Sequence, residues 1–192
     1  MMLQSNNLIH LWFNLLALTQ PEQEEYLKIA NIEIPTKISF NDMTLVLNGA
    51  GIRTKFFMNA YLCGLYLKEP STDADAIIYA NQPMGFRIYI LSSFITGDMM
   101  AQAIKEGFLK AMNGNISEIN DQLDKLLQLF LQEPIRLSDR YDLMYLPEKG
   151  IQISKNDSIR AYAEGLDFKQ AVCKVWLGKH PVQKELKKRL LG

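Results

Sequence analysis

The chain has 192 residues, of which 48% are hydrophobic, and this is enough for one domain with a core that needs no disulfides. Lysine plus arginine and aspartate plus glutamate both number 21, so no overall positive field exists to gather nucleic acid or an anionic membrane. No apolar run reaches the roughly 18 residues of a spanning helix, so stable membrane insertion is not expected.

The cysteines and histidines do not form a metal-site or redox pattern. Cys63 and Cys173 belong to no CxxC pair, and their apolar surroundings predict buried thiols. His10 and His180 have no cysteine or carboxylate partners nearby in the sequence. The sequence also contains no nucleophile elbow and no phosphate-binding loop. We therefore expect no metal and no cofactor.

Residues 1–30 differ from the rest and are predicted to be a tail outside the domain at 31–192. Residues 8–18 are apolar and have the length of an export signal, but they contain His10 and Asn14 and follow no Lys or Arg. This segment is either a degenerate signal or an amphipathic appendage that packs on the domain.

The pattern of residues 36–67 predicts β-strands, and one conspicuous cation, Arg53, lies among them. Asn41 and Asp42 separate two short β patterns and predict a hairpin. Gly49 and Gly51 predict a tight connection into a second strand at 56–67, whose two apolar faces indicate a central position. Arg53 lies at the edge of this layer. If partly buried, its guanidinium needs an anion or strong acceptor, and a solvated or salt-bridged turn arginine is the alternative.

Two amphipathic helices follow a short helix at 73–80 and a strand at 84–94. The first starts at Thr96 and carries Met100 and Phe108 on its apolar face, and the second follows residues 113–115. At this spacing such side chains usually belong to the core, with a ligand-lining role as the alternative. The two helices are expected to pack as a pair over the sheet.

The last third predicts a strand meander and then helices. Strand patterns cover 141–146, 151–154 and 159–163. Asp167 can cap a helix that carries Val175 and stops at Gly178, and a final helix from Pro181 ends in basic residues. Because strands and helices are segregated along the chain, we predict an α+β fold with an antiparallel sheet.

Two motifs resemble the chalcone isomerase fold family, particularly its bacterial chalcone isomerase-like branch: LNGAGIRTKFF followed by YLCGLYL, and AVCKVWLGKHPVQKELKK near the end. The resemblance covers about residues 32–192. It implies an open-faced β-sandwich in which a large antiparallel sheet is covered by helices, with a smaller strand layer. Relatives in this branch often carry an export signal, which favours the periplasm, with the cytoplasm as the alternative.

The resemblance to plant chalcone isomerases is carried by a single polar residue. In those enzymes an arginine of the Gly-rich segment steers the substrate phenolate and stabilises the developing enolate, and Arg53 matches it. The threonine of the next strand falls at Tyr61, a tyrosine and an asparagine of the long helix fall near Met100 and Gly107, and a later threonine falls at Val175. Losing these donors would cost orders of magnitude in rate, so the chain is not expected to be an isomerase.

The fatty-acid-binding proteins of the same fold are the better match. In them the matched arginine and a tyrosine on the next strand hold a carboxylate, while the acyl chain enters an apolar cleft. Arg53 and Tyr61 match that pair, and Met100, Phe108 and Val175 would form apolar walls. The resemblance thus implies a non-catalytic protein that binds a fatty acid or another small apolar anion.

Two alternatives remain. One is an intramolecular lyase of the chalcone-flavanone isomerase type, and the other is a scaffold protein without a ligand. No protein partner can be named. A binding protein needs a cavity that reaches Arg53, whereas an isomerase needs further donors converging near it. A scaffold would fill the space with side chains and pair Arg53 with an acid.

Overall fold

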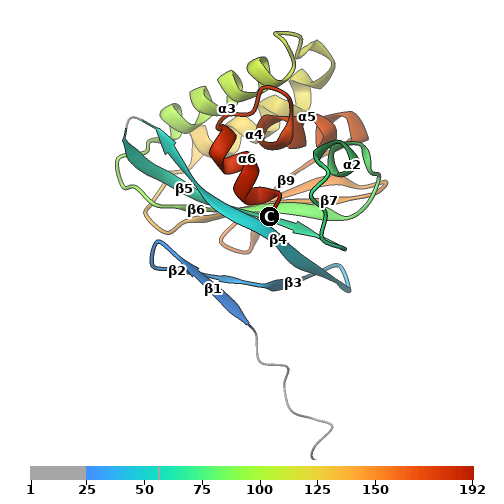
Figure 1. Ribbon diagram of the computed structural model, residues 1–192. Helices are drawn as coiled ribbons and strands as arrows, with labels where there is room; N and C mark the ends of the chain where they lie inside the picture. Colours follow the sequence, from blue (N-terminus) through green and yellow to red (C-terminus); the bar gives the residue numbers. More distant parts are fainter. Residues whose placement is uncertain (1–24, 56) are drawn as a thin grey trace, which may run out of the picture.

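The computed structural model describes residues 25–55 and 57–192, so the predicted signal or appendage at 8–18 lies outside the described residues. A curled, seven-stranded antiparallel sheet has helices on one face and a separate two-stranded hairpin on the other (Figure 1). The sheet order is β3-β4-β5-β6-β7-β8-β9. These strands are β3 (Lys37–Phe40), β4 (Met43–Lys55), β5 (Met58–Leu67), β6 (Met84–Ile90), β7 (Arg140–Leu146), β8 (Gly150–Lys155) and β9 (Ser158–Ala163).

The predicted hairpin and meander are confirmed, and both use the same kind of turn. Asn41 and Asp42 join β3 to β4 with φ angles of 46° and 58°, and Asn156 and Asp157 join β8 to β9 with 47° and 68°. Asn and Asp tolerate this left-handed backbone better than other residues with a Cβ. Their turn chemistry is why these connections could be located from the sequence.

The predicted turn at Gly49 and Gly51 is wrong, because both glycines lie inside the 13-residue strand β4. They serve close packing instead. A Cβ on Gly49 would lie 2.2 Å from the carbonyl oxygen of Arg189 in helix α6 (Lys184–Leu190). Asn48 holds the same helix end, since its Nδ2 donates to the carbonyl oxygen of Leu190 at 2.8 Å. The connection from β4 to β5 falls at residues 56–57.

Three other predicted boundaries also differ. The strand predicted at 84–94 ends at Ile90, after which the Ser92 side chain accepts a hydrogen bond from the Phe94 backbone N–H at 3.3 Å and turns the chain. Helix α5 (Leu166–Leu177) starts after Gly165, at φ 103°, without a side-chain cap from Asp167. Helix α6 starts three residues later than predicted.

The helices pack on one face of the sheet and bury the main core. They are α2 (Ala74–Tyr79), α3 (Gly97–Ala111), α4 (Asn120–Gln132), preceded by a 3₁₀ turn at Ser117–Ile119, and α5 and α6. Phe86 of β6 packs on Trp176 of α5 with ring centroids 4.5 Å apart. Cys63 and Cys173 are buried free thiols, as predicted, and burial raises the pKa of Cys173 to about 12.

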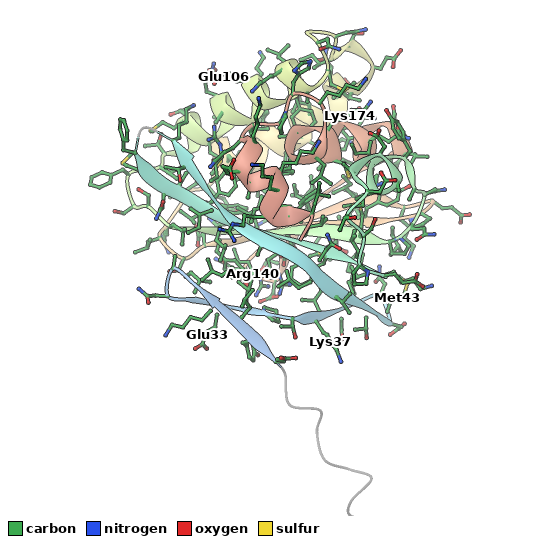
Figure 2. All side chains as sticks on the ribbon, in the orientation of Figure 1. Glu33, Lys37, Met43, Glu106, Arg140 and Lys174 are labelled. Atoms are coloured by element: carbon green, nitrogen blue, oxygen red, sulfur yellow. The ribbon has the colours of Figure 1, made fainter. Side chains whose placement is uncertain are left out.

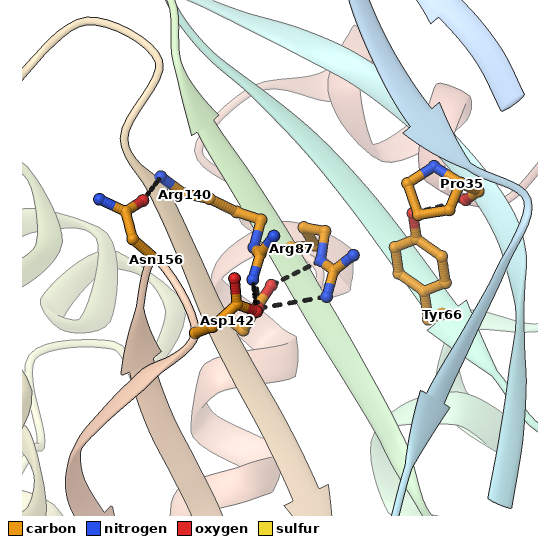
Figure 3. Close-up of polar contacts among 7 residues, drawn as sticks. Pro35, Tyr66, Arg87, Arg140, Asp142 and Asn156 are labelled. Atoms are coloured by element: carbon orange, nitrogen blue, oxygen red, sulfur yellow. Dashed lines mark hydrogen bonds and ion pairs between the residues drawn. The ribbon is translucent and has the colours of Figure 1, made fainter.

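The opposite face of the sheet holds a half-buried ionic cluster (Figure 3). Asp142 of β7 accepts two hydrogen bonds from Arg87, at 2.7 and 3.2 Å, and one from Arg140 at 3.1 Å. On the same side, the Tyr66 hydroxyl donates to the carbonyl oxygen of Pro35 at 2.8 Å. A satisfied cluster of this kind holds neighbouring strands in register but leaves little to bind a ligand.

Pro35 ends the hairpin that covers part of this face, made of β1 (Tyr26–Ile29) and β2 (Ile32–Pro35). The hairpin lies on the side away from the helices, with Glu33 and Glu106 at opposite ends of the molecule (Figure 2). The predicted boundary at residue 30 falls in its turn, at Ala30 and Asn31. The predicted domain therefore shares this hairpin with the last residues of the predicted tail.

Candidate ligand-binding site

A cavity of about 420 Å³ lies between the sheet and the helices. Its floor comes from β4, β5, β6 and β7, and its walls come mainly from α3, α4 and α5. Most of the lining is apolar, including Ile88, Ile104, Leu126, Phe130, Leu143 and Val172. Pockets for small ligands commonly have volumes of about 300–1,000 Å³, so this one has room for an extended apolar molecule.

All five residues proposed from the sequence line this one cavity. Arg53 comes from β4, Tyr61 from β5, Met100 and Phe108 from α3, and Val175 from α5. Met100, Phe108 and Val175 are also buried in the core, so each belongs to the core and lines the cavity at the same time. Their contact with a ligand stays a prediction.

Arg53 is held by neutral acceptors. Its Nη1 donates to the side-chain oxygen of Gln183 at 3.1 Å and to the backbone oxygen of Thr54. Within residues 25–55 and 57–192, no carboxylate lies within ion-pair distance of Arg53. Because a guanidinium carries five N–H donors and keeps its charge, Arg53 retains donors for an anion in the cavity.

Tyr61 is oriented by an indole. The Nε1 of Trp176 donates to the Tyr61 hydroxyl oxygen at 3.1 Å. Burial raises the pKa of the Tyr61 hydroxyl, more than the Trp176 hydrogen bond and the Arg53 charge lower it. The phenol therefore stays protonated at neutral pH. Since its oxygen is already used as an acceptor, its hydrogen remains available to donate into the cavity.

Gln183 and Trp176 are functional candidates that sequence reasoning missed. Gln183 Oε1 accepts from Arg53 and also from the backbone N–H of Thr54 at 3.0 Å, so it fixes both the side chain and the strand end. Trp176 belongs to the second family-like motif, and a lone tryptophan there was the available signal. Nothing in the pattern around Gln183 indicated its role.

We call the more exposed lining residues the rim: Lys55, Met58, Met99, Gln102, Glu106 and Lys110. Lys55 at the end of β4 pairs with Glu106 of α3 at 3.7 Å. Lys110 donates to the carbonyl oxygen of Pro181 at 2.9 Å. Among the charged side chains that line the cavity, Arg53, Lys55 and Lys110 are cations and Glu106 is the anion. The cavity lining of this neutral protein is therefore locally positive.

Among the residues that the structure describes, no group of three or more His, Cys, Asp or Glu side chains is placed to hold a metal ion. No helix among them is long and apolar enough to cross a membrane.

The curled antiparallel sheet, the helix layer on one face and the apolar cavity between them define an α+β protein with the chalcone isomerase-like fold. A model of the chalcone isomerase-like family matches residues 26–192, so the chain belongs to this family. The family and fold predicted from the sequence are thereby confirmed.

The structure is similar to the crystal structure of a fatty-acid binding protein from Arabidopsis thaliana, with a TM-score of 0.70 and 14% sequence identity. The similarity covers 87% of this chain and 96% of that chain. At this identity the likeness shows the shared fold. No curated protein sequence matches the chain significantly.

Proposed function

We propose that this protein binds a fatty acid, or another small apolar carboxylate, in the cavity, with its head group at Arg53 and Tyr61. The observation that carries the proposal is a guanidinium without a carboxylate partner among the described residues, on the lining of an apolar cavity. A charged donor in such a place is best satisfied by an anionic ligand with an apolar body.

The head group and the chain contribute differently to binding. Charge-assisted hydrogen bonds from Arg53 and Tyr61 to a carboxylate are worth about 1.5–3 kcal/mol each. Burial of an acyl chain gains roughly 0.8 kcal/mol per methylene before ordering costs are subtracted. Chain burial is therefore the larger contribution, and Arg53 decides which head group is accepted and which way the ligand lies.

The alternatives fit less well. A scaffold would fill the space and pair Arg53 with an acid, whereas the cavity is open and Arg53 is held by neutral acceptors. An isomerase needs several donors around the reacting oxygen, and by the family resemblance the helix positions that supply them in the plant enzymes fall near Met100 and Gly107 and at Val175 here. A similar protein described as a fatty-acid binding protein also favours binding over catalysis.

Native mass spectrometry with palmitate and 1-hexadecanol tests the proposal. Both molecules have the same chain length, and only palmitate carries a charge. Wild type should bind both and prefer palmitate. Arg53→Ala should lose roughly tenfold to a hundredfold in palmitate affinity and keep its affinity for hexadecanol, because the apolar walls are unchanged.

Arg160→Ala is the matched control. It also removes one guanidinium, but Arg160 lies on β9, which contributes no residue to the cavity lining, and it pairs with Glu133 at 3.0 Å. Its palmitate affinity should equal that of wild type. Failure of wild type to bind either molecule would reject the proposal, and a chalcone turnover assay would then test the isomerase alternative.

A further inference from the structure

The two most exposed large apolar side chains of the described residues lie beside the rim. Phe57 is fully exposed, at 104% of its reference area, and Phe94 is 74% exposed. Phe57 lies in the turn between the lining residues Lys55 and Met58, and Phe94 lies between the lining residues Ser92 and Ile95. A backbone hydrogen bond from the Leu91 N–H to the Ala60 oxygen, at 3.0 Å, joins the two segments.

Two rim residues extend this apolar surface. Met58 is 37% exposed and Met99 is 47% exposed, and both line the cavity. In Figure 1 the β4–β5 turn and the connection from β6 to α3 reach the same side of the molecule. Exposed apolar side chains therefore flank the cavity lining, both at the β4–β5 turn and along the connection from β6 to α3.

Folding alone does not favour phenylalanine at position 57. The residue has φ 63°, a left-handed conformation that is rare for bulky residues, and Asn or Gly would be preferred in such a turn. Its ring also packs against nothing in the described protein. Because local conformation and burial both disfavour this residue, contact with something outside the described residues is the better explanation.

We propose that the rim of the cavity docks on the surface of an anionic phospholipid bilayer, with Phe57 and Phe94 entering the headgroup region. Two features select a bilayer over a protein partner. The apolar side chains protrude singly from two turns instead of forming a flat patch, and aromatic rings at the tips of loops suit the interface between water and acyl chains. The cavity lining also carries three cations and one anion, which complements an anionic surface.

Flotation of the full chain with lipid vesicles tests this docking. One vesicle population contains phosphatidylcholine alone, and the other contains equal parts of phosphatidylcholine and phosphatidylglycerol. Wild type should float more with the anionic vesicles, and added salt should reduce the difference. Phe57→Ser/Phe94→Ser should lower the vesicle partition coefficient by about tenfold or more, since two apolar rings no longer insert.

Ile159→Ser/Tyr162→Ser is the matched control. It also replaces two exposed apolar side chains by serine and keeps the net charge, but both residues lie on β9, which does not line the cavity. Both double variants retain residues 1–24, so any contribution of that segment is the same in both. The control should float like wild type, and both variants should keep the wild-type thermal unfolding midpoint.

Equal flotation of the two double variants would overturn the proposal. Absence of wild-type flotation would also overturn it, and a protein partner would then be the remaining candidate for this surface. The assay contains no fatty acid. Its outcome therefore does not depend on the proposed ligand, and failure of palmitate binding would be seen separately by mass spectrometry.

Discussion

Arg53 and Tyr61 are direct cross-strand partners in the β4–β5 ladder, and both line the same cavity. The register shifts immediately after Arg53, between Arg53 and Thr54. A bulge at a strand end can re-aim a side chain, and here the displaced backbone is held by Gln183. The proposed head-group site thus depends on β4, on β5 and on the segment that precedes α6.

Gln183→Glu should reduce palmitate binding without unfolding the protein. The substitution places a carboxylate where Arg53 now meets a neutral oxygen at 3.1 Å, so the protein itself would supply the anion that we assign to the ligand. We expect palmitate affinity to fall roughly tenfold, as measured by native mass spectrometry.

Two comparisons sharpen this experiment. Hexadecanol affinity should stay at the wild-type level in Gln183→Glu, because the alcohol carries no charge that competes for Arg53. Gln152→Glu introduces the same charge on β8, which contributes no residue to the cavity lining, and should leave both affinities unchanged. A Gln183→Glu protein that binds palmitate as tightly as wild type would show that Arg53 does not hold the head group.

Tyr61→Phe should destabilise the protein as well as weaken palmitate binding. It leaves the Trp176 N–H without its acceptor at 3.1 Å, and an unpaired buried donor costs about 1–3 kcal/mol. Urea denaturation measures this loss. In Tyr61→Phe/Trp176→Phe the donor is removed too, so the double variant should be more stable than the sum of the single effects predicts. Strict additivity would contradict a hydrogen bond between the two residues.

The parts of the fold that were predicted correctly rest on local signals. The hairpin at Asn41 and Asp42 follows from turn chemistry, and the helix that begins after Thr96 follows from its cap, where the Thr96 side chain accepts from the Met99 N–H at 3.2 Å. Gly49 was misinterpreted because its role depends on Arg189, which lies far along the chain. Glycine signals both turns and close approach, and only the tertiary contact separates the two.

The candidate site also has residues that a local motif identifies and residues whose roles depend on tertiary contacts. The family motif is enough to pair Arg53 with Tyr61, and both residues line one cavity. Gln183 and Trp176 both lie in the second motif, but their roles could not be assigned from it, since each acts through a residue more than a hundred positions away. Whether the space between sheet and helices was open or filled also depends on packing that no local pattern specifies.

Gly49→Ala should lower the free energy of unfolding by about 1–3 kcal/mol or more, because the new methyl group meets backbone atoms of α6 that cannot rotate away. Gly107→Ala is the comparison. Its methyl group would meet only the Cγ1 atoms of Val182 and Val175, at 3.2 and 3.3 Å, and alanine gains up to about 1 kcal/mol of helix propensity. Urea denaturation should therefore place Gly107→Ala near wild type. Equal losses in the two variants would mean that α6 does not pack closely on β4.

Asp139 should make the stability of the protein depend on pH in the acidic range. Burial raises the pKa of this carboxyl. Hydrogen bonds from Asn156, from the Arg136 backbone N–H and from Lys155 at 3.0 Å together lower the pKa by more than burial raises it, so in the folded protein it lies below the ordinary value of 3.8. As the pH falls, the unfolded chain therefore binds more protons than the folded protein. The stabilisation present above about pH 4 is lost as the pH falls through the folded pKa.

Asp139→Asn should lower the free energy of unfolding by about 1–3 kcal/mol at pH 7. It should also reduce the loss of stability at acidic pH, as measured by urea denaturation at several values between pH 3 and pH 7. Asp124→Asn, an exposed change of the same kind on α4, controls for the lost surface charge. An Asp139→Asn curve parallel to wild type down to pH 3 would show that this carboxyl does not govern acid stability.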